Sequence, residues 1–109
     1  MQYGADVTYR EEVAQRIAVL RDAVRRWGCD RALLFGSAAR GDVHEGSDLD
    51  VLVVRRSDIP FVERPRELLA MLPPGLAVDV VVYTPEEFER LSRDPRGIVA
   101  SALAEGIEL

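Results

Sequence analysis

Acidic side chains inside apolar segments are the feature of this sequence that most directly indicates chemistry. Asp50 lies within the run Leu49–Val54, which otherwise holds only Leu and Val. Asp79 interrupts the run Val78–Tyr83 in the same way. Burying an ionised carboxylate among apolar groups costs free energy unless the group is paired or bound to a metal. Both acids are therefore candidates for a functional role.

A third acid, Asp48, stands one residue before the apolar run that contains Asp50. Because the side chains of a strand alternate between its two faces, we expect Asp48 and Asp50 to share a face. Taken alone, Asp48 is equally well explained as a turn residue that ends the preceding loop. A salt bridge to one of the 14 basic residues, all of them Arg, would explain any one of the three acids. A salt bridge explains the presence of all three acids together less well.

Carboxylates on neighbouring strands would supply the hard oxygen ligands that Mg²⁺ prefers. In proteins Mg²⁺ keeps several waters and is held by a few carboxylates together with substrate phosphates. Two such ions can stabilise the attacking and leaving oxygens of an in-line displacement at phosphorus. The sequence therefore indicates phosphoryl or nucleotidyl transfer, with Asp48, Asp50 and Asp79 as catalytic residues and metal ligands.

A glycine-serine turn precedes these acids. The run Ala32–Phe35 predicts a short buried strand that stops at Gly36 and Ser37. Glycine lets the backbone turn sharply and lets a ligand approach closely, and Ser37 would add a hydroxyl beside unpaired N–H groups. This suits a phosphate, although such a turn more often serves only as a helix cap. Arg40 could neutralise phosphate charge or could simply be solvated.

The remaining patterns predict the elements that position these residues. Apolar residues at helical spacing predict an amphipathic helix over residues 9–27, with Thr8 as its N-cap and Gly28 at its end. The runs 49–54 and 78–83 predict strands buried on both faces. Further helices are expected where apolar residues are bounded by Pro, Gly or Thr: over Phe61–Leu72, from Pro85 to about Ser92, and after Gly97. This order predicts an α/β or α+β domain with a small sheet.

Length and composition limit the classes of protein to consider. The 109 residues give room for one domain, which we expect to span residues 1–109. A net charge of −5 argues against unaided nucleic-acid binding, because that depends on a positive patch that neutralises phosphates. The single Cys29 cannot form an internal disulfide, and no secretory signal or membrane-spanning run is present. We therefore expect a cytoplasmic location.

The spacing of the chemical residues resembles the signature of the DNA polymerase β-type nucleotidyltransferase superfamily. The resemblance rests on Gly36-Ser37, ten intervening residues, Asp48-Leu49-Asp50, and Asp79 where the third carboxylate is expected. It is strongest to the minimal nucleotidyltransferases, small prokaryotic proteins of about this length. The resemblance implies a mixed sheet flanked by helices, with two Mg²⁺ ions bound by the three acids. It also implies a nucleotide-binding set of Gly36, Ser37, Arg40 and Ser47.

The same resemblance implies a biological role. Minimal nucleotidyltransferases are commonly paired with a helical HEPN-type ribonuclease toxin, for which they serve as antitoxins, transferring AMP to a toxin tyrosine. Mg²⁺-dependent transfer of AMP from ATP to a hydroxyl of a partner protein is therefore expected, with Asp79 helping to activate the attacking hydroxyl. Two alternatives stay open: a non-catalytic antitoxin that neutralises its partner by occlusion, and a standalone transferase for a small molecule. Oligomeric state is left open. Ala38 departs from the pattern, since many minimal members carry a basic residue there, and Arg40 could compensate.

Overall fold

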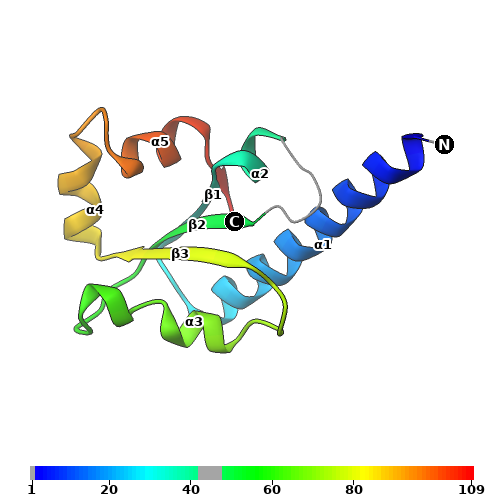
Figure 1. Ribbon diagram of the computed structural model, residues 1–109. Coiled ribbons are helices and arrows are strands. Elements are labelled where there is room, and N and C mark those ends of the chain that lie inside the picture. Colours follow the sequence, from blue (N-terminus) through cyan, green and yellow to red (C-terminus); the bar gives the residue numbers. More distant parts are fainter. Residues whose placement is uncertain (1, 42–47) are drawn as a thin grey trace.

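The computed structural model describes residues 2–41 and 48–109, with side chains described from Arg10 onward outside that gap. The described part holds one mixed sheet in the order β3-β2-β1-β4, with helices packed on it (Figure 1). This architecture confirms the predicted α/β class. The strands are β1 (Arg31–Phe35), β2 (Leu49–Val54), β3 (Val78–Tyr83) and β4 (Ile107–Glu108). The helical elements are α1 (Gln2–Trp27), α2 (Ser37–Arg40), η1 (a 3₁₀ turn, Phe61–Glu63), α3 (Arg66–Ala70), α4 (Pro85–Ser92) and α5 (Ile98–Glu105).

Helices cover both faces of the sheet because the side chains of its central strands alternate between two apolar cores. On one face, α1 and α3 pack on side chains that include Leu34, Val51 and Val53. On the other face, Leu33 and Leu52 pack against α5, with α4 contributing partly buried side chains. Figure 1 shows α1 and α3 on one side of the sheet and α5 on the other. Within the described part of the chain, no helix combines the length and apolar character that a membrane crossing requires.

The predicted bounds of β2 and β3 are confirmed, but their burial differs. β2 is central in the sheet and nearly all of its side chains are buried. β3 is an edge strand, and Val82 is the one side chain in it that is buried. The prediction that β3 is buried on both faces is wrong, because an apolar run does not reveal whether a strand is central or at the edge. Its outward-facing side chains remain partly open to solvent.

Two helices differ from their predicted bounds. α1 begins at Gln2, so Thr8 lies inside the helix and is not its N-cap. No proline stands in the first turns to prevent helix there, and the predicted end at Gly28 is confirmed by a backbone φ of 88°. The helix predicted over Phe61–Leu72 is split into η1 and α3, because Pro65 lacks an N–H and its ring would clash with the carbonyl four residues back.

The C-terminal segment follows its local signals and then adds a strand that was not predicted. Thr84 caps α4, and the Thr84 and Glu87 side chains each accept the other's backbone N–H. After α5, β4 pairs antiparallel with β1, with Ile107 opposite Leu34. A two-residue strand has no periodicity that a sequence pattern could reveal. β4 closes the sheet on the side away from β3.

Arg64, between η1 and α3, is a buried charged residue that sequence patterns gave no reason to expect. Its guanidinium donates to both Glu87 carboxylate oxygens, at 2.6 and 3.4 Å, and to the carbonyl oxygen of Val82 at 3.2 Å. It also donates to the carbonyl oxygen of Ile59 at 2.9 Å. Arg64 therefore links β3, α4 and the segment that follows β2.

Replacing Glu87 by Gln tests this link. The hydrogen bonds from Arg64 and from the Thr84 backbone lower the pKa of Glu87, so folding favours its ionised form. The pair therefore stabilises the fold above the unfolded-state pKa, about 4.3, and this contribution is lost as the pH falls through the folded-state pKa. We expect Glu87→Gln to lower the free energy of unfolding at pH 7 by about 1.5–3 kcal/mol, with less difference from wild type at pH 3, measured by urea denaturation.

Glu89→Gln is the matched control for that measurement. Glu89 pairs with Arg93 at 3.2 Å, but both side chains are about three-quarters exposed, at 74% and 75%. Exposed pairs contribute little, so this variant should stay within about 0.5 kcal/mol of wild type. Equal losses in the two variants would show that the Arg64–Glu87 pair has no special structural role.

Candidate active site

Asp50 and Asp79 lie side by side. They occupy equivalent positions in the parallel pair β2 and β3, where each is the second residue of its strand. Residues in register on neighbouring strands point to the same face of the sheet. The structure thus brings together the two acids that the sequence placed in separate apolar runs.

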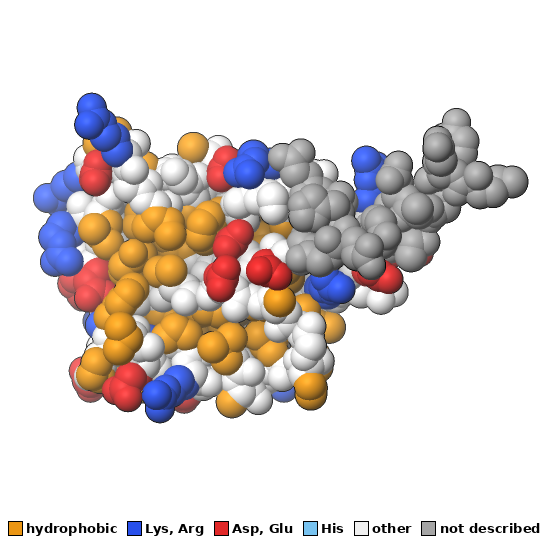
Figure 2. Space-filling model, in the orientation of Figure 1, with side chains coloured by type: hydrophobic (Ala, Val, Ile, Leu, Met, Phe, Trp, Pro, Cys, Tyr) orange, Lys and Arg blue, Asp and Glu red, His pale blue; other side chains and the backbone are white. Residues whose placement is uncertain are grey.

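The electrostatic environment of Asp50 is unfavourable for its ionised form. Partial burial raises the pKa of the Asp50 carboxyl, and the negative charges of Asp79 and Asp48 raise it further. A hydrogen bond between the Asp50 and Asp79 side chains acts in the same direction. Asp48, which is exposed directly before β2, therefore belongs to the same cluster of charge. We call Asp48, Asp50 and Asp79 the acidic cluster, and Figure 2 shows acidic side chains gathered near the middle of this face.

Gly36 packs directly against the acidic cluster. β1 is antiparallel to β2, so its last residue, Phe35, lies opposite Asp50 and the chain turns at the next residue. A Cβ atom added to Gly36 would lie 2.5 Å from Oδ2 of Asp50, and the backbone φ of Gly36 is 74°. Both observations favour glycine at this position. Ser37 follows at the start of α2, so the structure places the predicted glycine-serine turn beside the acids.

Arg40 approaches the same cluster from the end of α2. Its backbone N–H donates to the carbonyl oxygen of Gly36 at 3.2 Å, and its positive charge partly offsets the raised pKa of Asp50. Nη1 of its guanidinium lies 3.1 Å from Oε1 of Glu105, at the end of α5. Glu105 could not be predicted from the sequence, because no local pattern marks one acidic residue among many at the end of a helix.

Ala38 and Ser47 are the two other residues near the glycine-serine turn and the acids in the sequence. Ala38 is buried, with 8% of its surface exposed, and packs in the core beneath α2. Ala38 packs in the core that contains Leu49 and Val51, on the face of β2 opposite Asp50, and Arg40 is the one basic residue of α2. Ser47 lies outside the described residues.

The donor set suits a hard cation. Within residues 2–41 and 48–109, no three or more His, Cys, Asp or Glu side chains converge as a ready-made metal site. The acidic cluster nevertheless offers carboxylate oxygens only, and the mutual repulsion that raises the pKa of Asp50 would be relieved by a bound cation. Mg²⁺ completes its coordination with water and substrate phosphates and does not need a closed protein cage. The residues therefore fit Mg²⁺ that is bound together with a substrate.

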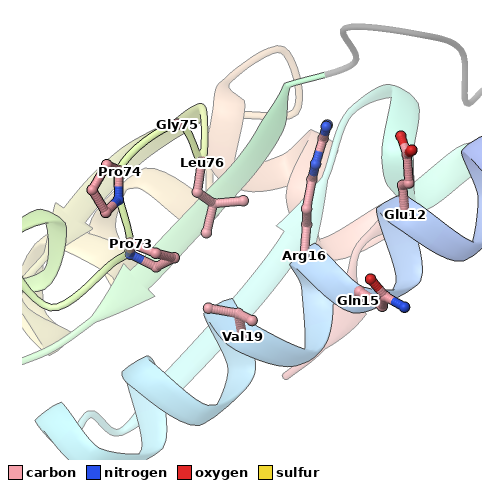
Figure 3. Close-up of a pocket in the computed structure, with 8 residues that line it drawn as sticks. All are labelled: Glu12, Gln15, Arg16, Val19, Pro73, Pro74, Gly75 and Leu76. Atoms are coloured by element: carbon pink, nitrogen blue, oxygen red, sulfur yellow. The ribbon is translucent and has the colours of Figure 1, made fainter.

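A groove elsewhere on the molecule contains none of these residues. It has a volume of about 280 Å³ and lies between α1 and the turn that precedes β3. Its lining is Glu12, Gln15, Arg16 and Val19 of α1 and the turn Pro73–Leu76. Figure 3 shows the apolar side chains of Val19 and Leu76 facing each other across it. Glu12 is the one carboxylate residue among the described residues that line the groove, so the acidic cluster, with its three carboxylates, is the candidate site.

Comparisons with known proteins bear on the family and the fold of the chain. A sequence profile that describes a nucleotidyltransferase domain matches residues 17–94, a segment that includes the acidic cluster and the glycine-serine turn. The chain is also similar to the crystal structure of a proposed nucleotidyltransferase from Sulfolobus solfataricus, with a TM-score of 0.53 and 18% identity. That similarity covers 97% of this chain and 83% of the other, and at this identity it concerns the fold alone. No curated protein matches the chain.

Replacing Asp50 by Asn tests the electrostatic cost of the cluster. Because folding raises the pKa of Asp50, ionisation of this group destabilises the fold above its unfolded-state pKa, about 3.9. The cost disappears as the pH falls and the carboxyl is protonated in both states. We expect Asp50→Asn to raise the free energy of unfolding by about 0.5–2 kcal/mol at pH 7 without divalent cations, and to match wild type near pH 3.

The control variant is Asp58→Asn, because Asp58 is exposed in the loop that follows the opposite end of β2. It should leave the free energy of unfolding within about 0.5 kcal/mol of wild type at both pH values. If Asp50→Asn destabilised the protein at pH 7, the repulsion inferred for the acidic cluster would be wrong.

Proposed function

The chain belongs to the nucleotidyltransferase domain family, and from this premise we propose that it transfers AMP from ATP to a hydroxyl group of a partner protein. The observation that carries the proposal is the in-register pair Asp50 and Asp79, packed against the backbone of Gly36. Carboxylates beside a tight glycine turn supply what a nucleotidyl transfer needs: groups that bind cations and a surface that admits phosphates. β2 packs between the two apolar cores, and this packing holds the acidic pair and the glycine turn at one end of the sheet.

The acidic cluster would hold two Mg²⁺ ions, with Asp48, Asp50 and Asp79 as their ligands. When bound, Mg²⁺ would neutralise phosphate charge and stabilise the oxygens that attack and leave. Asp79 is the more exposed of the two paired acids, so its carboxylate is accessible to an incoming hydroxyl. In this proposal Asp79 also accepts the proton of that hydroxyl.

The transfer would proceed by in-line displacement at the α-phosphorus of ATP. The acceptor oxygen forms a bond to that phosphorus while the bond to the bridging oxygen of the β-phosphate breaks, and pyrophosphate leaves. Gly36 and Ser37 would lie against the phosphates, because this turn packs next to Asp50 and a glycine lets a ligand approach the backbone closely. Arg40 would offset the negative charge of the triphosphate, and Ser47 is proposed from the sequence as a further contact.

A protein acceptor is supported by the surface beside the acidic cluster. Val81 and Tyr83 follow Asp79 on the same face of β3, and both are half-buried. Phe61 stacks on Tyr83 with ring centroids 5.4 Å apart and keeps 43% of its surface exposed. Figure 2 shows apolar side chains around the acidic ones on this face. Exposed aromatic surface is enriched in protein interfaces. A helical HEPN-type toxin, with this chain as its antitoxin, is the partner that we propose from the sequence resemblance.

The proposal predicts covalent AMP on a partner protein. The protein is isolated from its own cells with whatever binds it, and intact masses are recorded before and after incubation with Mg²⁺ and ATP. We expect the partner to gain whole AMP units. The Asp48→Asn/Asp50→Asn double variant should reduce the rate of this gain at least about a hundredfold, because charge stabilisation at the phosphates is lost.

The control is the Asp22→Asn/Asp58→Asn double variant, which makes the same change in net charge at exposed positions outside the acidic cluster. It should transfer AMP as wild type does. Binding and neutralisation of the partner without any gain in mass would contradict the proposal and support inhibition by occlusion. Transfer to a small molecule without any partner would instead support a standalone transferase.

A further inference from the structure

The ion pair between Arg40 and Glu105 links the candidate site to the C-terminal helix. The two residues are 65 positions apart in the chain, and Nη1 of Arg40 donates to Oε1 of Glu105 at 3.1 Å. They meet because α5 packs against β1, and β1 leads directly into the Gly36 turn and α2. Because the two residues belong to different elements, the contact forms only in the folded domain.

Glu105 is held in place by its neighbour, Gly106. A Cβ atom at Gly106 would lie only 2.1 Å from the carbonyl oxygen of Ala102, to which the Gly106 N–H donates at 2.8 Å. The next residue, Ile107, pairs with Leu34 of β1, two residues before Gly36. The backbone of Glu105 is therefore fixed close to the strand end that carries the site. A carboxylate on this fixed backbone lies within reach of the Arg40 side chain.

Arg40 has an alternative set of partners close by. Its backbone is hydrogen-bonded to Gly36, which contacts the Asp50 carboxylate, and its charge acts on Asp50. An arginine next to several carboxylates gains most by pairing with them, and in that position it would oppose cation binding. Glu105 offers a competing carboxylate to one side. The observed pair commits Nη1 of Arg40 to Glu105 rather than to the acids.

We propose that Glu105 is a positioning residue that holds the Arg40 guanidinium where it binds the β- and γ-phosphates of a nucleoside triphosphate. This inference rests on the nucleotide-binding function proposed above. On this proposal, the preference for a triphosphate over a monophosphate depends on Glu105 of α5, which lies outside the glycine-serine turn and the acidic cluster. It also fits the burial of Ala38, which leaves Arg40 as the cation that α2 directs to the site.

Nucleotide binding tests this proposal without any need for an acceptor. Isothermal titration calorimetry measures the Kd of the whole protein for ATP and for AMP, each with Mg²⁺, in wild type and in Glu105→Gln. We expect Glu105→Gln to raise the Kd for ATP about tenfold, the loss expected for one charged hydrogen bond. The Kd for AMP should change less than about twofold, because Arg40 acts on phosphates that AMP lacks.

Two further variants separate positioning from general damage. Arg40→Gln should raise the Kd for ATP at least as much, and adding Glu105→Gln to it should cause no further loss, because both act through one guanidinium. Glu89→Gln removes a surface acid that also pairs with an arginine and should leave both constants unchanged. Glu105→Asp keeps the charge on a shorter side chain and should recover part of the affinity for ATP, which also covers the case in which Glu105→Gln is poorly folded.

The outcomes distinguish this inference from the proposed function. Wild type that fails to bind ATP would contradict the proposed function itself. Wild type that binds ATP while Glu105→Gln binds it equally well or better would overturn the role of Glu105 alone. Additive losses in the double variant, or an equal loss of AMP binding, would also overturn it, because Glu105 would then act by some route other than Arg40.

Discussion

The in-register pairing of β2 and β3, which brings the Asp50 and Asp79 carboxylates together, is the constraint on which the candidate site depends. Two like charges in register on adjacent strands repel each other, as the raised pKa of Asp50 reflects. The two apolar cores hold the register against this repulsion, because a slip of one residue would move each β2 side chain into the opposite core and would turn Asp50 toward the core beneath α1 and α3. Apolar burial therefore offsets the repulsion between the two carboxylates, and this repulsion does not contribute to the stability of the fold.

Two glycines then determine which other residues reach this pair. Gly36 lets the end of β1 turn against Asp50, and so brings α2 and Arg40 to the cluster. Gly106 lets α5 end against β1, and so brings Glu105 to Arg40. Both are positions where a Cβ atom would collide with nearby atoms. The geometry of the site is set by backbone packing at these points as much as by the charged side chains.

Local sequence patterns predicted the elements whose bounds depend on interactions between residues close in the sequence. The bounds of β2 and β3, and the N-cap of α4 at Thr84, follow from apolar runs and capping residues. The predicted chemistry requires Asp50 and Asp79 to lie close together. Their shared register follows from the order and direction of the strands, which the sequence of one strand does not reveal. Glu105, β4 and the Arg64 pair escaped prediction because each depends on segments distant in the sequence. Pro65 was a local signal that the helical pattern around it obscured.

The charged residues of the domain divide according to how completely they are partnered. Arg64 is buried with hydrogen bonds to Glu87, Val82 and Ile59, and folding lowers the pKa of Glu87. That network gains stability from being folded, as a structural ion pair should. Asp50 is the opposite case, since folding makes its ionisation harder. Groups that a fold holds in an unfavourable charge state are typical of functional sites. The destabilising effect of ionised Asp50 distinguishes the acidic cluster from the other ionic contacts in the described part of the chain.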